Sequence, residues 1–259
     1  MTVPSAGWRA FIDLARALGC SGVEMRNDLA APMFGGDAPE DVATYARDRG
    51  IVIHALAEVY AFNDGTKNVM GKVRDLADLA RRSGATAIVL IPRKDGPEVS
   101  FDQLCAALDK IGGILAEAGV RGLVEPLGFP TSTLRDFDAA RAAIRETHGA
   151  SRFGIVHDTF HHHLSGAARI SSDLVEMVHI SGVTSQAPAE MLDDRDRGLL
   201  DGDDRLGSIA QIEALRAQGY SGPVSMEAFA PSVHDLRKPE VALRATFDFI
   251  HTSLKAHAA

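Results

Sequence analysis

Four short apolar segments of this chain each lead directly into a side chain of a type that binds metal ions. The segments are 122–124, 153–157, 174–178 and 223–226, and the residues that follow them are Glu125, Asp158, His179 and Glu227. If the segments are strands of a parallel barrel, their carboxyl ends meet at one mouth and these side chains converge. Carboxylates gathered at one point repel one another and need a cation between them. The pattern therefore predicts a barrel with a metal site at its mouth.

The rest of the chain alternates between strand-like and helix-like segments. Three further strands are expected at 21–25, 51–56 and 85–91, the strand before Glu125 starts at Arg121, and helices are expected at 8–18, 38–49, 67–83, 101–118, 134–147, 209–218 and 239–256. The strand segments are mostly apolar rather than alternating, which is typical of strands covered on both faces. Repeated strand–helix units indicate a parallel sheet with right-handed crossovers. We therefore expect an α/β fold, a (β/α)8 TIM barrel.

The front of the chain is short for such a barrel. Only seven good strands are found, whereas a closed barrel has eight, and the missing strand should precede the helix that begins at Trp8. Residues 1–4 are all that is available there, so the first strand is expected to be stunted or missing, or the sequence to begin late in it. No linker or low-complexity tract divides the chain, and residues 1–259 are predicted to form a single domain.

Composition excludes several classes of function. The net charge is -8 and lysine and arginine form no cluster, which argues against nucleic acid as a partner. The two cysteines, Cys20 and Cys105, lie far apart and suggest neither a disulfide framework nor a thiolate metal site. No apolar stretch is long enough to span a membrane, and the first residues lack the pattern of a signal peptide. These features favour a protein of the reducing cytoplasm with no membrane partner.

The predicted ligand set favours some metals over others. Three carboxylates and one imidazole suit Mn²⁺, Mg²⁺ or Co²⁺ in octahedral coordination better than a tetrahedral structural zinc. Four protein ligands would leave about two positions for substrate oxygens or water. His161 lies one helical turn after Asp158, and we expect it to support a metal ligand or to bind substrate rather than to ligate the metal itself. Arg26 and Asn27 end a strand at the same mouth and are further candidates for binding hydroxyl groups, although loop ion pairs and capped turns explain such residues equally well.

Several motifs around these residues resemble one known family. They are VEP around Glu125, DxxH from Asp158 to His161, HISG around His179 and SMEAF around Glu227. The chain resembles the xylose isomerase-like TIM barrel family, which includes sugar isomerases, ketose 3-epimerases, hydroxypyruvate isomerase, inosose isomerase and relatives of endonuclease IV. The resemblance implies that the four residues hold one divalent metal and that the two glutamates also move a proton. It further implies an arginine that contacts substrate, best matched by Arg197, with Arg195 as a rival.

Within that family, the GVEMRND segment and the stretch from DRLG to SMEAF look most like inosose (2-keto-myo-inositol) isomerases. The resemblance implies an isomerase of inositol catabolism that acts on a small polyol ketone through a cis-enediolate. It favours Mn²⁺ as the single metal cofactor, with Mg²⁺, Co²⁺ and Zn²⁺ left open, and a polyol or sugar as the partner. A ketose 3-epimerase or hydroxypyruvate isomerase is the nearest alternative.

Two other classes fit the residues less well. A hydrolase of the endonuclease type would need more metal ligands and a basic face, and a non-catalytic sugar-binding barrel would have no need for two opposed glutamates. Barrels of this kind often associate, so the sequence leaves a homo-oligomer open.

Overall fold

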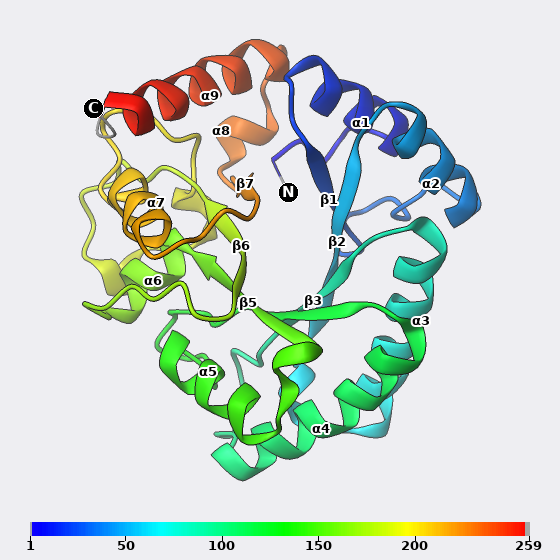
Figure 1. The fold of residues 1–259 in the computed structure, drawn as a ribbon. Coiled ribbons are helices and arrows are strands. Elements are labelled where there is room, and N and C mark those ends of the chain that lie inside the picture. The colour runs from blue at the N-terminus through cyan, green and yellow to red at the C-terminus, as the bar shows by residue number, and fades with distance from the viewer. Residues whose placement is uncertain (1, 257–259) are drawn as a thin grey trace.

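The computed structural model describes residues 2–256, and its centre is a parallel sheet of seven strands. The strands are β1 (Gly22–Arg26), β2 (Val52–Tyr60), β3 (Ala87–Ile91), β4 (Arg121–Val124), β5 (Phe153–Asp158), β6 (Val175–Ile180) and β7 (Val224–Met226). Their order in the sheet follows the chain from β1 to β7, and every neighbouring pair is parallel. The sheet curves into a nearly closed barrel, so the predicted TIM-barrel fold is confirmed (Figure 1).

Helices surround this sheet on its outer face (Figure 1). They are α1 (Trp8–Ala17), α2 (Pro39–Asp48), α3 (Lys67–Ser83), α4 (Phe101–Ala118), α5 (Phe137–Glu146), α6 (Thr159–Ser165), α7 (Ser208–Ala217), α8 (Pro231–His234) and α9 (Pro239–Ala256). Short 3₁₀ turns lie at η1 (Phe62–Asp64), η2 (Gly149–Ser151), η3 (Ala189–Met191) and η4 (Asp194–Asp196). No helix among residues 2–256 is both long enough and apolar enough to cross a membrane.

Local capping explains why two of these helices begin and end where the sequence predicts. The Thr66 side chain accepts a hydrogen bond from the backbone N–H of Val69 at the start of α3, and Gly84 ends the helix with φ 71°. At the start of α4, Ser100 and Gln103 form a reciprocal capping box, and the helix ends at a left-handed Gly119. These signals depend only on neighbouring residues, so they can be recognised in the sequence.

Apolar side chains pack against both faces of the strands, inside the barrel and under the surrounding helices. All five residues of β3 are buried, as expected for a strand covered on both faces. Inside the barrel, apolar side chains, most of them small or branched and most of them on strands, form one cluster: Ala55, Ala57, Ala87, Val89, Ile91, Leu123, Leu127, Val156 and Met177. A larger cluster joins the outer faces of β1 to β5 to helices α1 to α5, and another joins β6 and β7 to α7 and α9. The strand ends at the mouth are therefore held on a packed scaffold.

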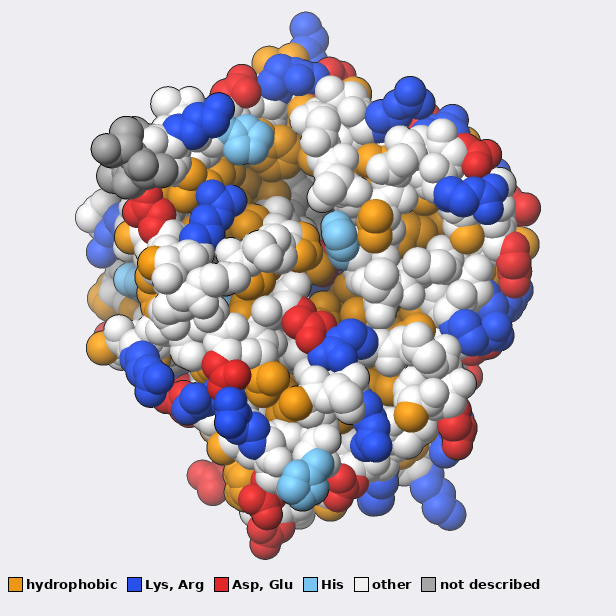
Figure 2. All heavy atoms as spheres, viewed as in Figure 1, with side chains coloured by type: hydrophobic (Ala, Val, Ile, Leu, Met, Phe, Trp, Pro, Cys, Tyr) orange, Lys and Arg blue, Asp and Glu red, His pale blue; other side chains and the backbone are white. Residues whose placement is uncertain are grey.

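The sheet is open between β1 and β7. Among residues 2–256 no strand precedes α1 and no pairing joins β1 to β7, as expected for a missing first strand. Met1, the first of the four residues available for that strand, lies outside the described residues. The Thr2 hydroxyl donates to the Met226 carbonyl at 2.8 Å and accepts from the Ala228 N–H at 3.1 Å, so the front of the chain lies beside the end of β7. A cavity of about 360 Å³ with many apolar side chains lies between α1, β1, β7 and α9, and it is visible as a hollow in Figure 2.

The structure also corrects some expected boundaries. His179 was expected just after a strand, but it is the next-to-last residue of β6 because β5 pairs with β6 as far as Asp158 and His179. Strand β2 continues to Tyr60 rather than ending at residue 56. The helix expected at 134–147 begins at Phe137, where the Asp136 side chain accepts a hydrogen bond from the Ala139 N–H. The short helix α8 had no counterpart among the predicted elements.

Candidate metal centre

The four residues predicted as metal ligands occupy equivalent places on neighbouring strands. Glu125 follows β4 and Glu227 follows β7, and each extends its strand's ladder by one hydrogen bond, from Glu125 N to Leu90 O at 3.1 Å and from Glu227 N to Ile180 O at 2.8 Å. Asp158 ends β5, and the register sets it directly beside His179 on β6. All four therefore lie at the carboxyl ends of adjacent parallel strands, where side chains of a barrel meet.

These side chains come together as one buried group. The Nδ1 atom of His179 lies 3.3 Å from Glu227 Oε2, 3.4 Å from Glu125 Oε1 and 4.0 Å from Asp158 Oδ2. One ligand atom from each of the four residues lies within 4.8 Å of every other. All four residues are buried. The spacing is suitable for a single ion held between three carboxylate oxygens and one ring nitrogen.

Asp158 divides its two oxygens between a structural contact and the site. Its Oδ1 accepts hydrogen bonds from the backbone N–H groups of Phe160 at 2.7 Å and His161 at 3.2 Å, and thereby caps the start of α6. Its Oδ2 faces the group and accepts from Arg197 at 2.6 Å. The cap fixes the orientation of the carboxylate before any ligand binds.

Arg197 is brought into the same group from a long loop. Its side chain is 1% exposed, and one guanidinium nitrogen donates to Asp158 Oδ2 at 2.6 Å and to Glu227 Oε2 at 2.9 Å. Its backbone carbonyl accepts from the N–H groups of Phe229 and Ala230, which ties the loop to the segment after β7. Arg195, the rival in the sequence, is 79% exposed and pairs with Asp193. The structure thus separates two arginines that lie two residues apart.

Arg26, at the end of β1, reaches the group through the other oxygen of Glu227. It donates to Glu227 Oε1 at 2.7 Å, to Glu58 Oε2 at 2.9 Å and to Asp28. Both oxygens of Glu227 are therefore bonded to arginines. Asn27 does not contact the group: its side-chain amide exchanges two hydrogen bonds of 3.0 Å with the backbone of Glu58. A direct role for Asn27 in binding substrate stays a prediction.

His161 is buried near the site and close to aromatic rings. Its ring centroid lies 5.0 Å from that of Phe129 and 5.3 Å from that of Phe160. Its Nδ1 atom is buried and has no hydrogen-bond partner among the described residues. Burial lowers the pKa of His161 to about 4, although the Asp158 carboxylate opposes the shift. The ring is therefore neutral near pH 7, with one buried nitrogen free to meet a ligand.

The charges in the group shift its titrations in opposite directions. Burial raises the pKa of Glu125 to about 7, and His179 only partly opposes that rise. Burial alone would lower the pKa of His179, but the carboxylates of Glu24, Glu227 and Glu125 raise it well above its ordinary value. The carboxylates around His179 thus carry more negative charge than the nearby cationic side chains neutralise. A bound cation would neutralise the excess, as expected of a cation-binding site.

Glu227 and Asp158 behave differently from Glu125. Burial would raise the pKa of Glu227, yet His179 and Arg197 hold it well below its usual value. Burial would likewise raise the pKa of Asp158, but the Arg197 guanidinium lowers it. These two carboxylates therefore stay ionised, whereas Glu125 is poised to take up a proton.

Sequence reasoning missed one carboxylate beside the site, Glu24, whereas Glu58 follows the strand expected at 51–56 and was a candidate for binding hydroxyl groups. Both oxygens of Glu24 lie 3.1 Å from Nε2 of His179, and Glu58 bonds Arg26. A signal for Glu24 was present, because it alternates with Val23 and Met25 on β1 and so shares a face with Arg26, which was expected at the mouth. A charged residue at an inward position of a barrel strand needs a partner.

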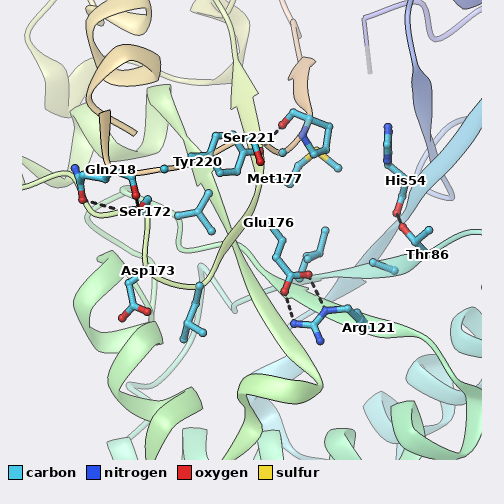
Figure 3. A pocket seen from close by; sticks show the side chains of 17 residues that line it. His54, Thr86, Arg121, Ser172, Asp173, Glu176, Met177, Gln218, Tyr220 and Ser221 are labelled. Carbon is cyan, nitrogen blue, oxygen red and sulfur yellow. Dashed lines mark hydrogen bonds and ion pairs between the residues drawn. The ribbon is translucent and has the colours of Figure 1, made fainter. Parts of the chain in front are cut away.

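A larger cavity, of about 730 Å³, lies at the opposite, amino-terminal end of the strands. None of the four candidate ligands lines it. Figure 3 shows the Arg121 and Glu176 side chains paired across it, and Arg121 also donates to the carbonyls of Ser151 and Phe153. Gly154 makes room for this pair, since a Cβ there would lie 2.5 Å from the Glu176 carboxyl carbon. An ion pair at this end of a barrel contributes to the stability of the scaffold, because active sites lie at the carboxyl ends of the strands.

Comparison with known proteins places the chain in a family. A family model described as xylose isomerase-like TIM barrel matches residues 12–252. The chain belongs to this family. The predicted resemblance is therefore confirmed. The family is one of sugar isomerases and epimerases, and this chain carries a buried Glu–Asp–His–Glu group.

Individual relatives are more distant. The inosose isomerase of Bacillus velezensis is 24% identical over 253 residues, which cover 92% of this chain and 89% of that protein. A xylose isomerase domain containing protein from Salmonella typhimurium LT2 superposes with a TM-score of 0.91 at 31% identity, over 98% of this chain and 94% of its own. The IOLI protein with a binding zinc atom superposes with a TM-score of 0.85 at 21% identity, over 97% and 94% of the two chains. The last likeness shows the fold alone.

Proposed function

We propose that this protein is a divalent-metal-dependent isomerase that moves a proton next to the carbonyl group of a small polyol ketone, with inosose as the favoured substrate. The observation that carries the proposal is the buried group of four ligand-type residues, which includes two glutamates. The likeness to an inosose isomerase along 92% of the chain supports this choice of substrate. A ketose 3-epimerase would use the same proton chemistry and differ only in where the proton returns.

The donor set fits a single divalent ion. Glu125, Asp158, Glu227 and Nδ1 of His179 would hold it, with Mn²⁺ favoured because carboxylate oxygens predominate and Mg²⁺, Co²⁺ or Zn²⁺ as alternatives. When bound, such an ion would supply Lewis-acid stabilisation of the negative charge that develops on the substrate oxygens.

The two glutamates differ in how firmly they are held. Both oxygens of Glu227 are bonded to arginines, whereas the hydrogen-bond contact of Glu125 within the group is with His179 at 3.4 Å. With no ion bound, burial raises the pKa of Glu125 to about 7, so Glu125 is the more basic of the two glutamates, and a carboxylate oxygen not engaged with the ion would accept the proton from carbon. Glu125 is therefore assigned the removal of the proton. Glu227 is assigned the return of a proton, which it would first take up from solvent once substrate has displaced Arg26 from Glu227 Oε1, while Glu125 releases its own proton to solvent.

The remaining candidates would orient the substrate. Arg197 is fixed by Asp158 and Glu227 and adds positive charge where enediolate oxygens form. The free Nδ1 of His161 offers a hydrogen bond to a substrate hydroxyl, and Arg26 offers another at the rim. Correct placement of the reacting carbon against Glu125 depends on such contacts.

Hydrogen exchange tests the proposal directly. Metal-saturated protein in D₂O should introduce deuterium at the carbon next to the carbonyl of inosose, and a panel of ketohexoses should react more slowly. Glu125→Gln keeps the shape of the side chain but cannot accept the proton, so exchange should fall by about 10²-fold or more. The control is Glu190→Gln, a change in the exposed turn η3. Exchange by Glu125→Gln at the wild-type rate would remove Glu125 from proton transfer, and no exchange with any polyol ketone would refute the proposed activity.

A further inference from the structure

The contact between Glu24 and His179 is not needed to assemble the four ligands. Glu24 lies on β1 and His179 on β6, so the contact crosses the barrel rather than following one ladder. Both carboxylate oxygens lie 3.1 Å from Nε2, the ring nitrogen that faces away from the other carboxylates. The Glu24 side chain is 12% exposed, and it also forms a hydrogen bond with Ser225. Ser225 is paired in register with His179, so strands β1, β6 and β7 all meet here.

The two nitrogens of the His179 ring thus have different environments. Nδ1 lies within 3.4 Å of Glu125 and Glu227 oxygens, and Nε2 has the Glu24 carboxylate. A neutral imidazole can bind a cation through only one nitrogen while the other carries a proton. A carboxylate at Nε2 favours the proton there and leaves the Nδ1 lone pair facing the three ligand carboxylates. It also fixes the ring plane and makes the ligating nitrogen more basic.

We propose that Glu24 is a positioning residue for the metal centre, which acts through His179 by fixing its tautomer and ring orientation. The proposal rests on the metal site of the proposed function and adds to it a fifth residue that does not contact the ion. Loss of such a partner typically weakens metal binding by about 10- to 100-fold.

A simpler explanation is that Glu24 only adds negative charge. Glu58 provides the matched control, because it is a second carboxylate at the mouth that bonds Arg26 and is 18% exposed. Glu24→Gln and Glu58→Gln each remove one carboxylate at nearly constant volume. If charge alone matters, the two variants should lose affinity to a similar degree. If the contact with His179 matters, only Glu24→Gln should lose it strongly.

The experiment measures Zn²⁺ and Mn²⁺ affinity of the metal-free, full-length chain by competition with a chromophoric chelator, with no substrate present. Glu24→Gln should bind both ions at least about 10-fold more weakly than wild type, and Glu58→Gln should stay within about threefold. Glu24→Asp, which keeps the charge, should recover part of the affinity. Thermal unfolding without metal checks that each variant is folded. Equal affinities of Glu24→Gln and Glu58→Gln would overturn the proposal.

A spectroscopic signature tests the tautomer itself. In Zn²⁺-loaded protein with nitrogen-15 histidine, His179 of the wild type should show a slowly exchanging proton on Nε2. Glu24→Ala should retain the zinc resonance pattern on Nδ1 at saturating metal but lose that slow exchange. A proton on Nδ1 in zinc-loaded wild type would overturn the proposal. Tight metal binding that depends on Glu24, together with no turnover of any polyol ketone, would support the positioning role and refute only the proposed activity.

Discussion

Replacement of Arg197 by methionine should strongly destabilise the metal-free protein. Arg197 is 1% exposed, and its guanidinium pairs with the buried carboxylates of Asp158 and Glu227 at 2.6 and 2.9 Å. Methionine fills much of the same volume but leaves both carboxylates without this cation. Breaking a buried ion pair by removing one partner typically costs about 3–5 kcal/mol. For a chain of this size, each kcal/mol lowers the melting temperature by about 2–4 °C, so a drop of about 6–20 °C is expected.

The assay is urea unfolding and scanning calorimetry of both proteins in the presence of a chelator. Arg195→Met is the matched control, since Arg195 is 79% exposed and its pair with Asp193 lies at the surface. That variant should change the free energy of unfolding by no more than about 0.5 kcal/mol. Addition of Mn²⁺ should restore part of the stability of Arg197→Met, because a bound cation supplies the missing charge and stabilises the folded state by mass action.

The pH dependence of this loss has a defined sign. The Arg197 guanidinium holds the pKa of Asp158 below its ordinary value of 3.8, against the effect of burial. A lowered carboxylate pKa contributes stability that is present above the unfolded value and is lost as the pH falls through the folded value. The difference between wild type and Arg197→Met should therefore be full at neutral pH and shrink below about pH 4. Equal stability of Arg197→Met and Arg195→Met in chelator would refute this account of the buried charges.

Two further predictions concern the scaffold around the site. A Cβ at Gly182 would lie 2.4 Å from the Leu199 carbonyl oxygen, whereas one at Gly198 would meet its nearest neighbour at an ordinary 3.5 Å. Gly182→Ala should therefore destabilise the protein by about 1–3 kcal/mol in urea unfolding and Gly198→Ala by much less, and equal effects would contradict the packing of this loop. Burial lowers the pKa of His162 to about 4, below its unfolded value near 6.5, so the unfolded chain binds the extra proton and stability is lost as the pH falls from about 6.5 to 4. Between about pH 6.5 and pH 4, the free energy of unfolding of His162→Gln should fall by about 1 kcal/mol less than that of wild type, a figure that allows for the partly exposed ring. Parallel curves of stability against pH for the two proteins would contradict the assignment.

Much of the fold could be predicted because its signals are local. The bounds of α3 and α4 match the prediction, since Thr66, Gly84, Ser100 and Gly119 mark their ends. The four ligand-type residues come together for a reason that is also visible in the sequence. Each ends or nearly ends an apolar strand, and parallel strands bring those ends to one mouth.

The residues that were missed depend on contacts between distant parts of the chain. Glu24 and His179 are 155 positions apart, and no local pattern pairs them. The choice between Arg195 and Arg197 depends on a loop that is fixed by a bridge between Gly182 and Gly198 and by hydrogen bonds to the segment after β7. Such arrangements follow from tertiary packing, so the spacing of residues in the sequence could not decide them.

The most direct test of the central claim is anomalous diffraction from crystals grown with Mn²⁺. The account predicts one strong peak per chain, within about 2.0–2.6 Å of carboxylate oxygens of Glu125, Asp158 and Glu227 and of Nδ1 of His179. A peak coordinated by other residues, or none at this group at saturating Mn²⁺, would contradict it.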